Sequence, residues 1–220
     1  MITSTLVIIG GYLLGSVASA IIICRMLGLP DPREGGSGNP GATNVLRLGG
    51  RKAGAMTLAG DVFKGVLPVL IARALGESEW VVAATAVAAF LGHLYPIFFR
   101  FQGGKGFATA IGAIAALSWL TFIGMGLTWL AVAGLSRYAS LASLVASALA
   151  PVYAWFITGR LEWVVAMIVL AVFSFVRHRG NIERLIAGTE SRIGDKAKAK
   201  ESEPVTQDTQ SSTESSSAES

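Results

Sequence analysis

Three short polar strings carry the residues whose chemistry could serve a reaction. The first covers residues 35–47 and is rich in glycine. Glycines let consecutive backbone N–H groups approach an anion, and a helix beginning near Thr43 or Asn44 would add its positive end. Flexible Gly-Ser linkers rarely combine Asn-Pro, Thr-Asn and a nearby arginine, so the string favours anion binding.

The second string covers residues 100–106 and reads Arg-Phe-Gln-Gly-Gly-Lys-Gly. Lys105 lies between glycines, where its ammonium would bind a phosphate or anchor the neighbouring apolar segment at a membrane surface. A Walker phosphate loop is excluded, because Gly106 stands where that motif needs Ser or Thr and Phe99 stands where it needs glycine.

The third string covers residues 177–190, and its arginines surround His178 and Asn181. These two residues lie about one helical turn apart and can share a helix face. A histidine beside anionic substrates can act as a general base near neutral pH, and the alternative is a polar surface group. No Ser-His-Asp triad is legible, and Cys24 lies in an apolar run. The pattern therefore favours direct transfer between two bound substrates.

The rest of the chain is too apolar for a soluble domain and must position these strings from a membrane. Of the 220 residues, 52% are hydrophobic and only 15% are charged, which excludes a nucleic-acid-binding protein despite the net charge of +4. The run 107–135, about 29 residues long, exceeds one span and is interrupted near Ser118, so we divide it. The prediction is a polytopic all-α bundle of seven spans, some short or broken, from the runs 6–23, 53–75, 80–99, 107–135, 141–157 and 161–176.

Charge placement orients this bundle. Residues 30–52 are basic and the turn 77–79 is acidic, so the N-terminus is expected outside and the C-terminus in the cytoplasm. A five-span arrangement keeps the same odd parity. The first apolar run is expected to be a retained span rather than a signal peptide, because no Lys or Arg precedes it. Within it Gly11, Gly15 and Ser19 form a packing stripe.

Polar groups inside the predicted spans have a structural or a substrate-binding interpretation. Asp61 and Lys64 lie three residues apart and are expected to form an ion pair that supports the bundle, with direct substrate contact as the alternative. His93 is expected to be a hydrogen-bonded packing residue about two to three turns below the glycines of the second string.

The chain divides into two parts. Residues 1–194 are predicted to form a single transmembrane domain. Residues 195–220 begin with three lysines and continue as a Ser/Thr/Glu-rich tract, which predicts a disordered polar tail.

Taken together, the strings resemble the motifs of the bacterial membrane-integral acyl-phosphate glycerol-3-phosphate acyltransferases of the PlsY type. Residues 37–47 are similar to the first motif of that family. Gly92-His93, Pro96 and residues 103–106 are similar to the second, and Arg177-His178, Asn181 and residues 188–190 to the third. The resemblance covers about residues 3–193 and does not include the tail.

The resemblance implies an enzyme of phospholipid biosynthesis in the bacterial cytoplasmic membrane, with its active site on the cytoplasmic face. It would transfer a fatty acyl group from acyl phosphate to the 1-hydroxyl of glycerol 3-phosphate, giving lysophosphatidic acid and inorganic phosphate. The resemblance implies no metal, no other cofactor and no acyl-CoA. Expected partners are the two substrates, the lipid bilayer and a soluble enzyme that makes acyl phosphate, without nucleic acid.

On this resemblance each string receives a role. The acyl phosphate is assigned to the loop residues Gly36, Ser37, Gly38, Asn39, Gly41, Thr43 and Asn44. Glycerol 3-phosphate is assigned to Arg47, Gly104, Lys105, His178 and Asn181. His178 is the candidate base, with Asn181 orienting the hydroxyl and Ser37 as a third catalytic candidate, and a substrate phosphate oxygen is the rival base. A carrier for phosphorylated metabolites is the alternative function, although matched hydrophobic halves are not visible.

Overall fold

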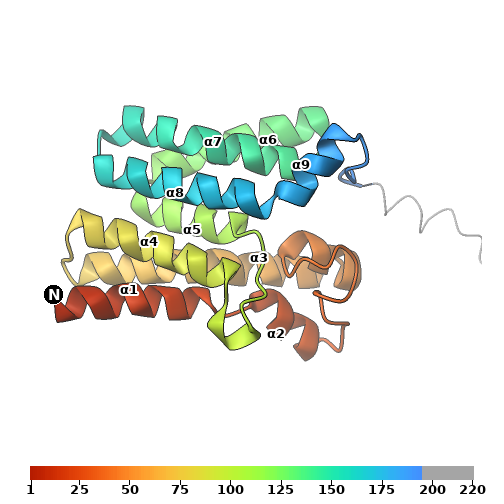
Figure 1. Cartoon of the computed structure of the whole chain (residues 1–220), viewed down its shortest axis with the longest axis horizontal. Helices are drawn as coiled ribbons and strands as arrows, with labels where there is room; N and C mark the ends of the chain where they lie inside the picture. The colour runs from red at the N-terminus through yellow and green to blue at the C-terminus, as the bar shows by residue number, and fades with distance from the viewer. Residues whose placement is uncertain (195–220) are drawn as a thin grey trace, which may run out of the picture.

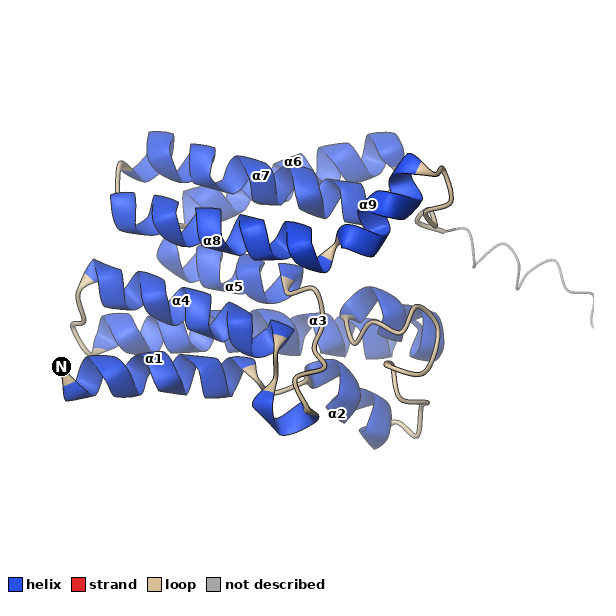
Figure 2. Cartoon of the chain, viewed as in Figure 1, coloured by secondary structure: helices blue, strands red, loops and turns tan. Residues whose placement is uncertain are grey.

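The computed structural model describes residues 1–194, and the chain is helical in that range without a strand (Figure 2). The expected all-α fold is confirmed, and the predicted disordered tail lies outside the described residues. The elements are α1 (Ile2–Gly15), α2 (Ser19–Met26), α3 (Ala42–Ala74), α4 (Glu79–Leu94), the short 3₁₀ helix η1 (Ile97–Phe99), α5 (Phe107–Leu117), α6 (Trp119–Ser136), α7 (Ala139–Thr158), α8 (Leu161–Arg177) and α9 (Arg179–Ile186).

Two groups of helices pack side by side. Helices α1, α3 and α4 contact one another, as α7 does with both α6 and α8 (Figure 1). Helix α5 packs on α3 and α4 and also reaches α6, and α4 packs against α8. The buried centre between the groups contains Phe90, Ile114 and Met167. This arrangement places α5 and the loop before it at the junction of both groups.

Glycines set the distance between α1 and α4. A Cβ atom at Gly15 would overlap the carbonyl oxygen of Ala89, and one at Gly92 would overlap the carbonyl oxygen of Tyr12. Small residues allow such close backbone approach in membranes, where apolar burial does not drive helices together. The end of α4 that carries His93 is therefore fixed closely to α1.

The N-terminal apolar run is broken rather than continuous. Helix α1 ends at Gly15, α2 begins at Ser19, and the two are bent by 41°. The expected stripe of three small residues is therefore wrong at Ser19, which leaves the face of Gly11 and Gly15 and packs against Gly60 instead. The break frees the carbonyl of Val17, and Lys64 donates a hydrogen bond to it at 2.7 Å.

The long run 107–135 divides where the sequence predicts. Ser118 ends α5 and caps α6, and its Oγ accepts hydrogen bonds from the backbone N–H and the hydroxyl of Thr121. A side-chain acceptor at this position satisfies donors that the start of a helix leaves unpaired.

The number of spans stays a prediction. Four helices of the described part are long and apolar enough to cross a bilayer, and the count reaches six if the bent pairs α1–α2 and α8–α9 each make one span. Helix α5 has 11 residues, or about 16 Å, which is half of a hydrocarbon core. Seven spans require α5 to cross as well.

The three polar strings lie at one end of the bundle (Figure 1). Arg177 donates hydrogen bonds to the second string, and Arg47 of the first donates one to Ser191, just beyond the third. The turn between α3 and α4 lies at the opposite end, where Glu79 forms an ion pair with Arg160 at 2.6 Å. The helices thus gather residues from distant parts of the sequence at one surface.

Candidate active site

Asn44 shapes the glycine-rich loop. Its side chain is buried, its Nδ2 donates hydrogen bonds to the carbonyl oxygens of Pro32 (2.8 Å) and Gly35 (2.9 Å), and its Oδ1 accepts one from the N–H of Ser37 (2.8 Å). Gly36 packs against this amide with φ +64°, where a Cβ would overlap Oδ1. Both amide hydrogens are used, so the expectation that Asn44 donates to a substrate is corrected: it holds the loop.

The glycine-rich loop presents polar side chains, rather than free backbone N–H groups, as possible donors to an anion. The N–H groups of Ser37, Gly38 and Gly41 are engaged within the segment, by Asn44 Oδ1, Gly35 O and Asn39 O respectively. The expected convergence of consecutive glycine N–H groups is therefore not seen. Exposed polar side chains remain at Ser37 and Thr43, and Thr43 lies in the first turn of α3, next to the positive end of its dipole.

The first string approaches the other two at separate points. Arg47 is exposed, and its Nη2 donates a hydrogen bond to Ser191 Oγ at 3.0 Å. A Cβ at Gly104 would lie 3.0 Å from the carbonyl oxygen of Pro40, so the loop also borders the second string.

The second string is clamped between α4 and α8. Arg177 donates hydrogen bonds from Nη2 to the carbonyl of Gly103 (2.7 Å) and from Nε to that of Gly104 (3.1 Å), and its guanidinium lies over the ring of Tyr95. On the other side, Gly104 N donates to the carbonyl of His93 at 3.3 Å. The expected separation of two to three helical turns between His93 and these glycines is wrong, because the chain folds back over the end of α4.

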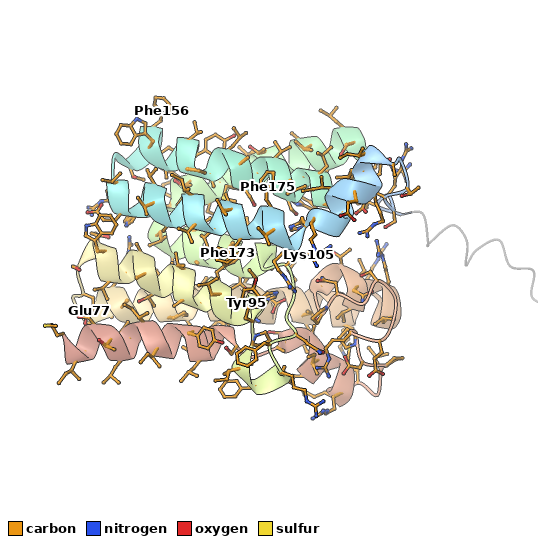
Figure 3. The ribbon with its side chains drawn as sticks, viewed as in Figure 1. Glu77, Tyr95, Lys105, Phe156, Phe173 and Phe175 are labelled. Atoms are coloured by element: carbon orange, nitrogen blue, oxygen red, sulfur yellow. The ribbon has the colours of Figure 1, made fainter. Side chains whose placement is uncertain are left out.

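Lys105 connects the second string to the third. Its Nζ donates a hydrogen bond to Oδ1 of Asn181, and Figure 3 shows its side chain well away from the end of the bundle that carries Glu77. Burial lowers the pKa of Lys105 to about 8, Glu190 opposes this shift, and Arg184, Arg47 and Arg177 add to it. The ammonium thus lies in a region with an excess of positive charge, which suits a phosphate group.

Glu190 fixes the other end of the Asn181 amide. Its Oε1 accepts hydrogen bonds from Asn181 Nδ2 (2.6 Å) and Ser140 Oγ (2.8 Å), and its Oε2 accepts one from Arg184 Nε (2.7 Å). Burial alone would raise the pKa of Glu190, but these hydrogen bonds lower it overall, so it remains a carboxylate.

His178 is held in one tautomer at the junction of α8 and α9. Its Nδ1 lies 2.8 Å from the carbonyl oxygen of Ser174. A carbonyl can only accept, so Nδ1 carries the proton and Nε2 has the free lone pair. The imidazole is therefore arranged to accept a proton at Nε2.

The expected ion pair lies inside the bundle rather than at its polar surface. Asp61 Oδ1 is 2.9 Å from Lys64 Nζ, and both side chains are buried. Asp61 also faces the ring of His93, at 3.5 Å from Nδ1. No group of three or more His, Cys, Asp or Glu side chains within residues 1–194 could hold a metal ion.

Three residues with clear roles in this geometry were not assigned to a substrate from the sequence, although the motifs of the resemblance include them. Arg177 and Glu190 lie within the third string, and their charges could have drawn attention to them. His93 was expected only to pack, because its contact with Gly104 depends on the path of the chain after α4.

Known proteins resemble the chain over nearly all of the described part. The family model described as glycerol-3-phosphate acyltransferase matches residues 5–188. A glycerol-3-phosphate acyltransferase of Methylococcus capsulatus is 54% identical over 84% of this chain and 93% of its own length. One of Thioalkalivibrio sulfidiphilus is 52% identical over 91% and 98%.

Solved structures agree with these matches. A crystal structure of PlsY (YgiH), an integral membrane glycerol 3-phosphate acyltransferase in its glycerol 3-phosphate form, has a TM-score of 0.85 and 39% identity over 90% of this chain and 98% of that one. A lysophosphatidic acid form of PlsY has a TM-score of 0.82 over 87% and 96%. The fold, the three strings and these relatives all indicate the same family. The chain belongs to the glycerol-3-phosphate acyltransferase family, in its PlsY-type membrane-integral branch.

Proposed function

We propose that the chain transfers a fatty acyl group from an acyl phosphate to the 1-hydroxyl of glycerol 3-phosphate, releasing lysophosphatidic acid and inorganic phosphate. The observation that carries this proposal is the connection of the strings at one end of the bundle, through Lys105 to Asn181 and Arg47 to Ser191. Both proposed substrates carry a phosphate, and this surface gathers cations from three parts of the chain. The solved relative in forms with glycerol 3-phosphate and lysophosphatidic acid supports the same acceptor and product.

The first string is assigned to the acyl phosphate. The hydroxyls of Ser37 and Thr43 and the amide of Asn39 would donate to its phosphate, close to the first turn of α3. Gly36 and Gly38, at φ +64° and +67°, allow the turns that bring these groups together, and a Cβ at Gly41 would crowd the amide of Asn39. Asn44 contributes by holding the loop in shape.

Glycerol 3-phosphate is assigned to the surface between the second and third strings. Lys105 and Arg47 would bind its phosphate, and Gly104, which has no side chain, lets the backbone before Lys105 pack closely against His93. Asn181 would orient the attacking hydroxyl beside His178, since both residues lie at the start of α9.

The reaction needs positioning more than activation. The hydroxyl oxygen forms a bond to the acyl carbon, the bond from that carbon to the phosphate oxygen breaks, and inorganic phosphate leaves. The hydroxyl proton goes to Nε2 of His178, and a substrate phosphate oxygen is the rival acceptor. An acyl phosphate has a good leaving group, so holding two anions in register supplies most of the rate enhancement.

We place the polar end in the cytoplasm of a bacterial cell, with seven spans across its cytoplasmic membrane. The basic strings lie at that end, and the acidic turn between α3 and α4 lies at the other. The acyl chain would then enter sideways from the inner leaflet, and a soluble enzyme that makes acyl phosphate would deliver the donor there.

A side-by-side donor assay tests the proposal. Purified protein in detergent is given glycerol 3-phosphate with acyl phosphate, acyl-CoA or acyl carrier protein carrying the same chain. We expect lysophosphatidic acid and equimolar phosphate from acyl phosphate alone, and a Lys105→Met control should lose most of this product. Comparable rates with acyl-CoA would contradict the donor assignment. Flux of glycerol 3-phosphate into liposomes without acylated product would instead favour the carrier.

A further inference from the structure

His93 lies directly beneath the glycines of the second string. Helix α4 ends at Leu94, and the chain then turns through η1 and returns across the end of the helix. A Cβ atom at Gly104 would overlap Nε2 of His93, and one at Gly103 would overlap the carbonyl oxygen of the same histidine. Both glycines therefore rest on His93 with no space for a side chain between them.

Two further helices hold the opposite edge of the imidazole. Nδ1 lies 3.0 Å from Oγ1 of Thr109 on α5 and 3.5 Å from Oδ1 of Asp61 on α3. Asp61 is paired with Lys64 at 2.9 Å, and Lys64 donates to the carbonyl of Val17 at the break between α1 and α2. The ring is thus connected to α3, to α5 and to the break between α1 and α2 through polar contacts.

Little free space surrounds this cluster. A cavity of about 10 Å³ lies beneath the second string, and Asp61, Lys64, His93, Gly103 and Gly104 all contribute to its wall. That volume is about the size needed for one water molecule. Arg177 holds the same two glycines from above through their carbonyl oxygens. A displacement of His93 would consequently move the backbone that leads to Lys105.

We propose that His93 is a positioning residue: its ring, fixed by Asp61 and Thr109, sets the position of Gly104 and thereby holds Lys105 beside Asn181. The consequence for glycerol 3-phosphate rests on the proposed assignment of Lys105 to that substrate. His93 acts through the loop and does not touch the reacting atoms. Misplacement of a binding group by about 1 Å is enough to change a rate on the order of a hundredfold.

The test is a double-mutant cycle between positions 93 and 104 in the purified full chain. His93→Ala should raise the KM for glycerol 3-phosphate by about tenfold or more, with a smaller change in kcat and an unchanged KM for the acyl donor. His93→Gln, which restores bulk against Gly104, should recover a large part of this loss.

Gly104→Ala should raise the same KM, because its new Cβ would overlap the imidazole. In the His93→Ala background it should add less than about twofold, because the overlapping ring is gone and the two effects are coupled. Thr85→Ala is the matched control. Thr85 is also buried on α4, but its hydroxyl bonds to the carbonyl of Val81 in its own helix, and this variant should keep the wild-type KM.

Size-exclusion profiles and thermal midpoints establish that each variant is folded. Unchanged KM values for both substrates in His93→Ala, equal losses in kcat and both KM values, or independent effects at positions 93 and 104 would overturn the proposal. If His93→Ala does not fold, His93→Gln and Gly104→Ala are compared instead. A larger rise in the KM for glycerol 3-phosphate in Gly104→Ala than in His93→Gln supports the proposal. An unchanged KM in both variants overturns it. If positions 93 and 104 are coupled in the KM for the acyl donor alone, the result supports the positioning role of His93. It contradicts the assignment of Lys105 to glycerol 3-phosphate.

Discussion

Lys105 donates a hydrogen bond to the Oδ1 atom of Asn181, although 76 positions separate the two residues in the chain. The Nδ2 atom of the same amide donates to Glu190 at 2.6 Å. A flip of the amide would place its nitrogen against an ammonium and its oxygen against a carboxylate, so the observed orientation is strongly favoured. Asn181 therefore joins the second and third strings into one unit.

Removal of the Glu190 carboxylate should weaken this unit. In Glu190→Ala the Asn181 amide loses its acceptor, and Lys105 loses a nearby opposite charge. We expect kcat/KM for glycerol 3-phosphate to fall tenfold to a hundredfold, which corresponds to about 1.5–3 kcal/mol for a hydrogen bond to a charged group. Steady-state kinetics measure the change.

Ser140→Ala is the matched control for Glu190, because it removes only the hydroxyl that donates to Oε1. Its loss should stay within about 0.5–1.5 kcal/mol, the range for an ordinary hydrogen bond. If Glu190→Ala cost no more than Ser140→Ala, the carboxylate would not be orienting Asn181.

The pKa of Lys105 predicts an alkaline limit to activity. Burial lowers this pKa to about 8, so the side chain is an ammonium below that pH and a neutral amine above it. Since only the ammonium attracts a phosphate, kcat/KM for glycerol 3-phosphate should fall as the pH rises through about 8. Lys105→Arg keeps its charge at all these pH values. A profile from pH 6 to 10 should therefore lose the alkaline limb in this variant, whatever its absolute rate, and an unchanged limb would assign the titration to another group.

His178 and a substrate phosphate oxygen compete as the base, and single-turnover kinetics separate them. If Nε2 of His178 accepts the proton, His178→Ala should slow the acyl-transfer step by about 10²–10⁴-fold. Rapid quenching of enzyme saturated with both substrates isolates that step from binding and product release. A near-normal rate would remove His178 from the proton transfer and leave the substrate phosphate as the base.

Asn44 should act on the shape of the first string rather than on substrate directly. Asn44→Ala removes the groups that pair with Ser37 N–H and with the Pro32 and Gly35 carbonyls. Each buried polar group left without a partner costs about 1–3 kcal/mol, so the loop should open more often. Trypsin cleavage after Arg33 should become severalfold faster, whereas Thr43→Ala, at an exposed position, should keep the wild-type cleavage rate. Equal cleavage rates in the two variants would argue against a scaffolding role.

The sequence was sufficient for the helical class, the division at Ser118 and the pairing of Asp61 with Lys64. Each of these depends on local chemistry: apolar length, a capping hydroxyl, and the cost of an unpaired charge in a bilayer. The break after Gly15 was not predictable in this way, because a continuous span also accepts small residues such as Ser16, Ala18 and Ser19. Lys64, which donates to the Val17 carbonyl at the break, lies 47 positions away in the chain.

The candidate site shows the same division. Residue types and the family resemblance identified Lys105, His178 and Asn181, which the structure brings to one end of the bundle. The role of Asn44 was missed because its partners are backbone atoms, which carry no signature in residue type. The contact between His93 and Gly104 was missed because it depends on how the chain turns after α4.

The most direct test of the account asks whether all three strings face the same side of the membrane. The Cys24→Ser background removes the one native cysteine. Single cysteines are then placed at Ser37, Arg100 and Gly188, one in each string. A cysteine at Ser78, at the opposite end of the bundle, is the control, and all four positions are exposed. A membrane-impermeant maleimide is then added to sealed vesicles of known orientation. The three positions from the strings should react from the cytoplasmic side and Ser78 from the other. Reaction of any one of the three together with Ser78 would contradict a shared site.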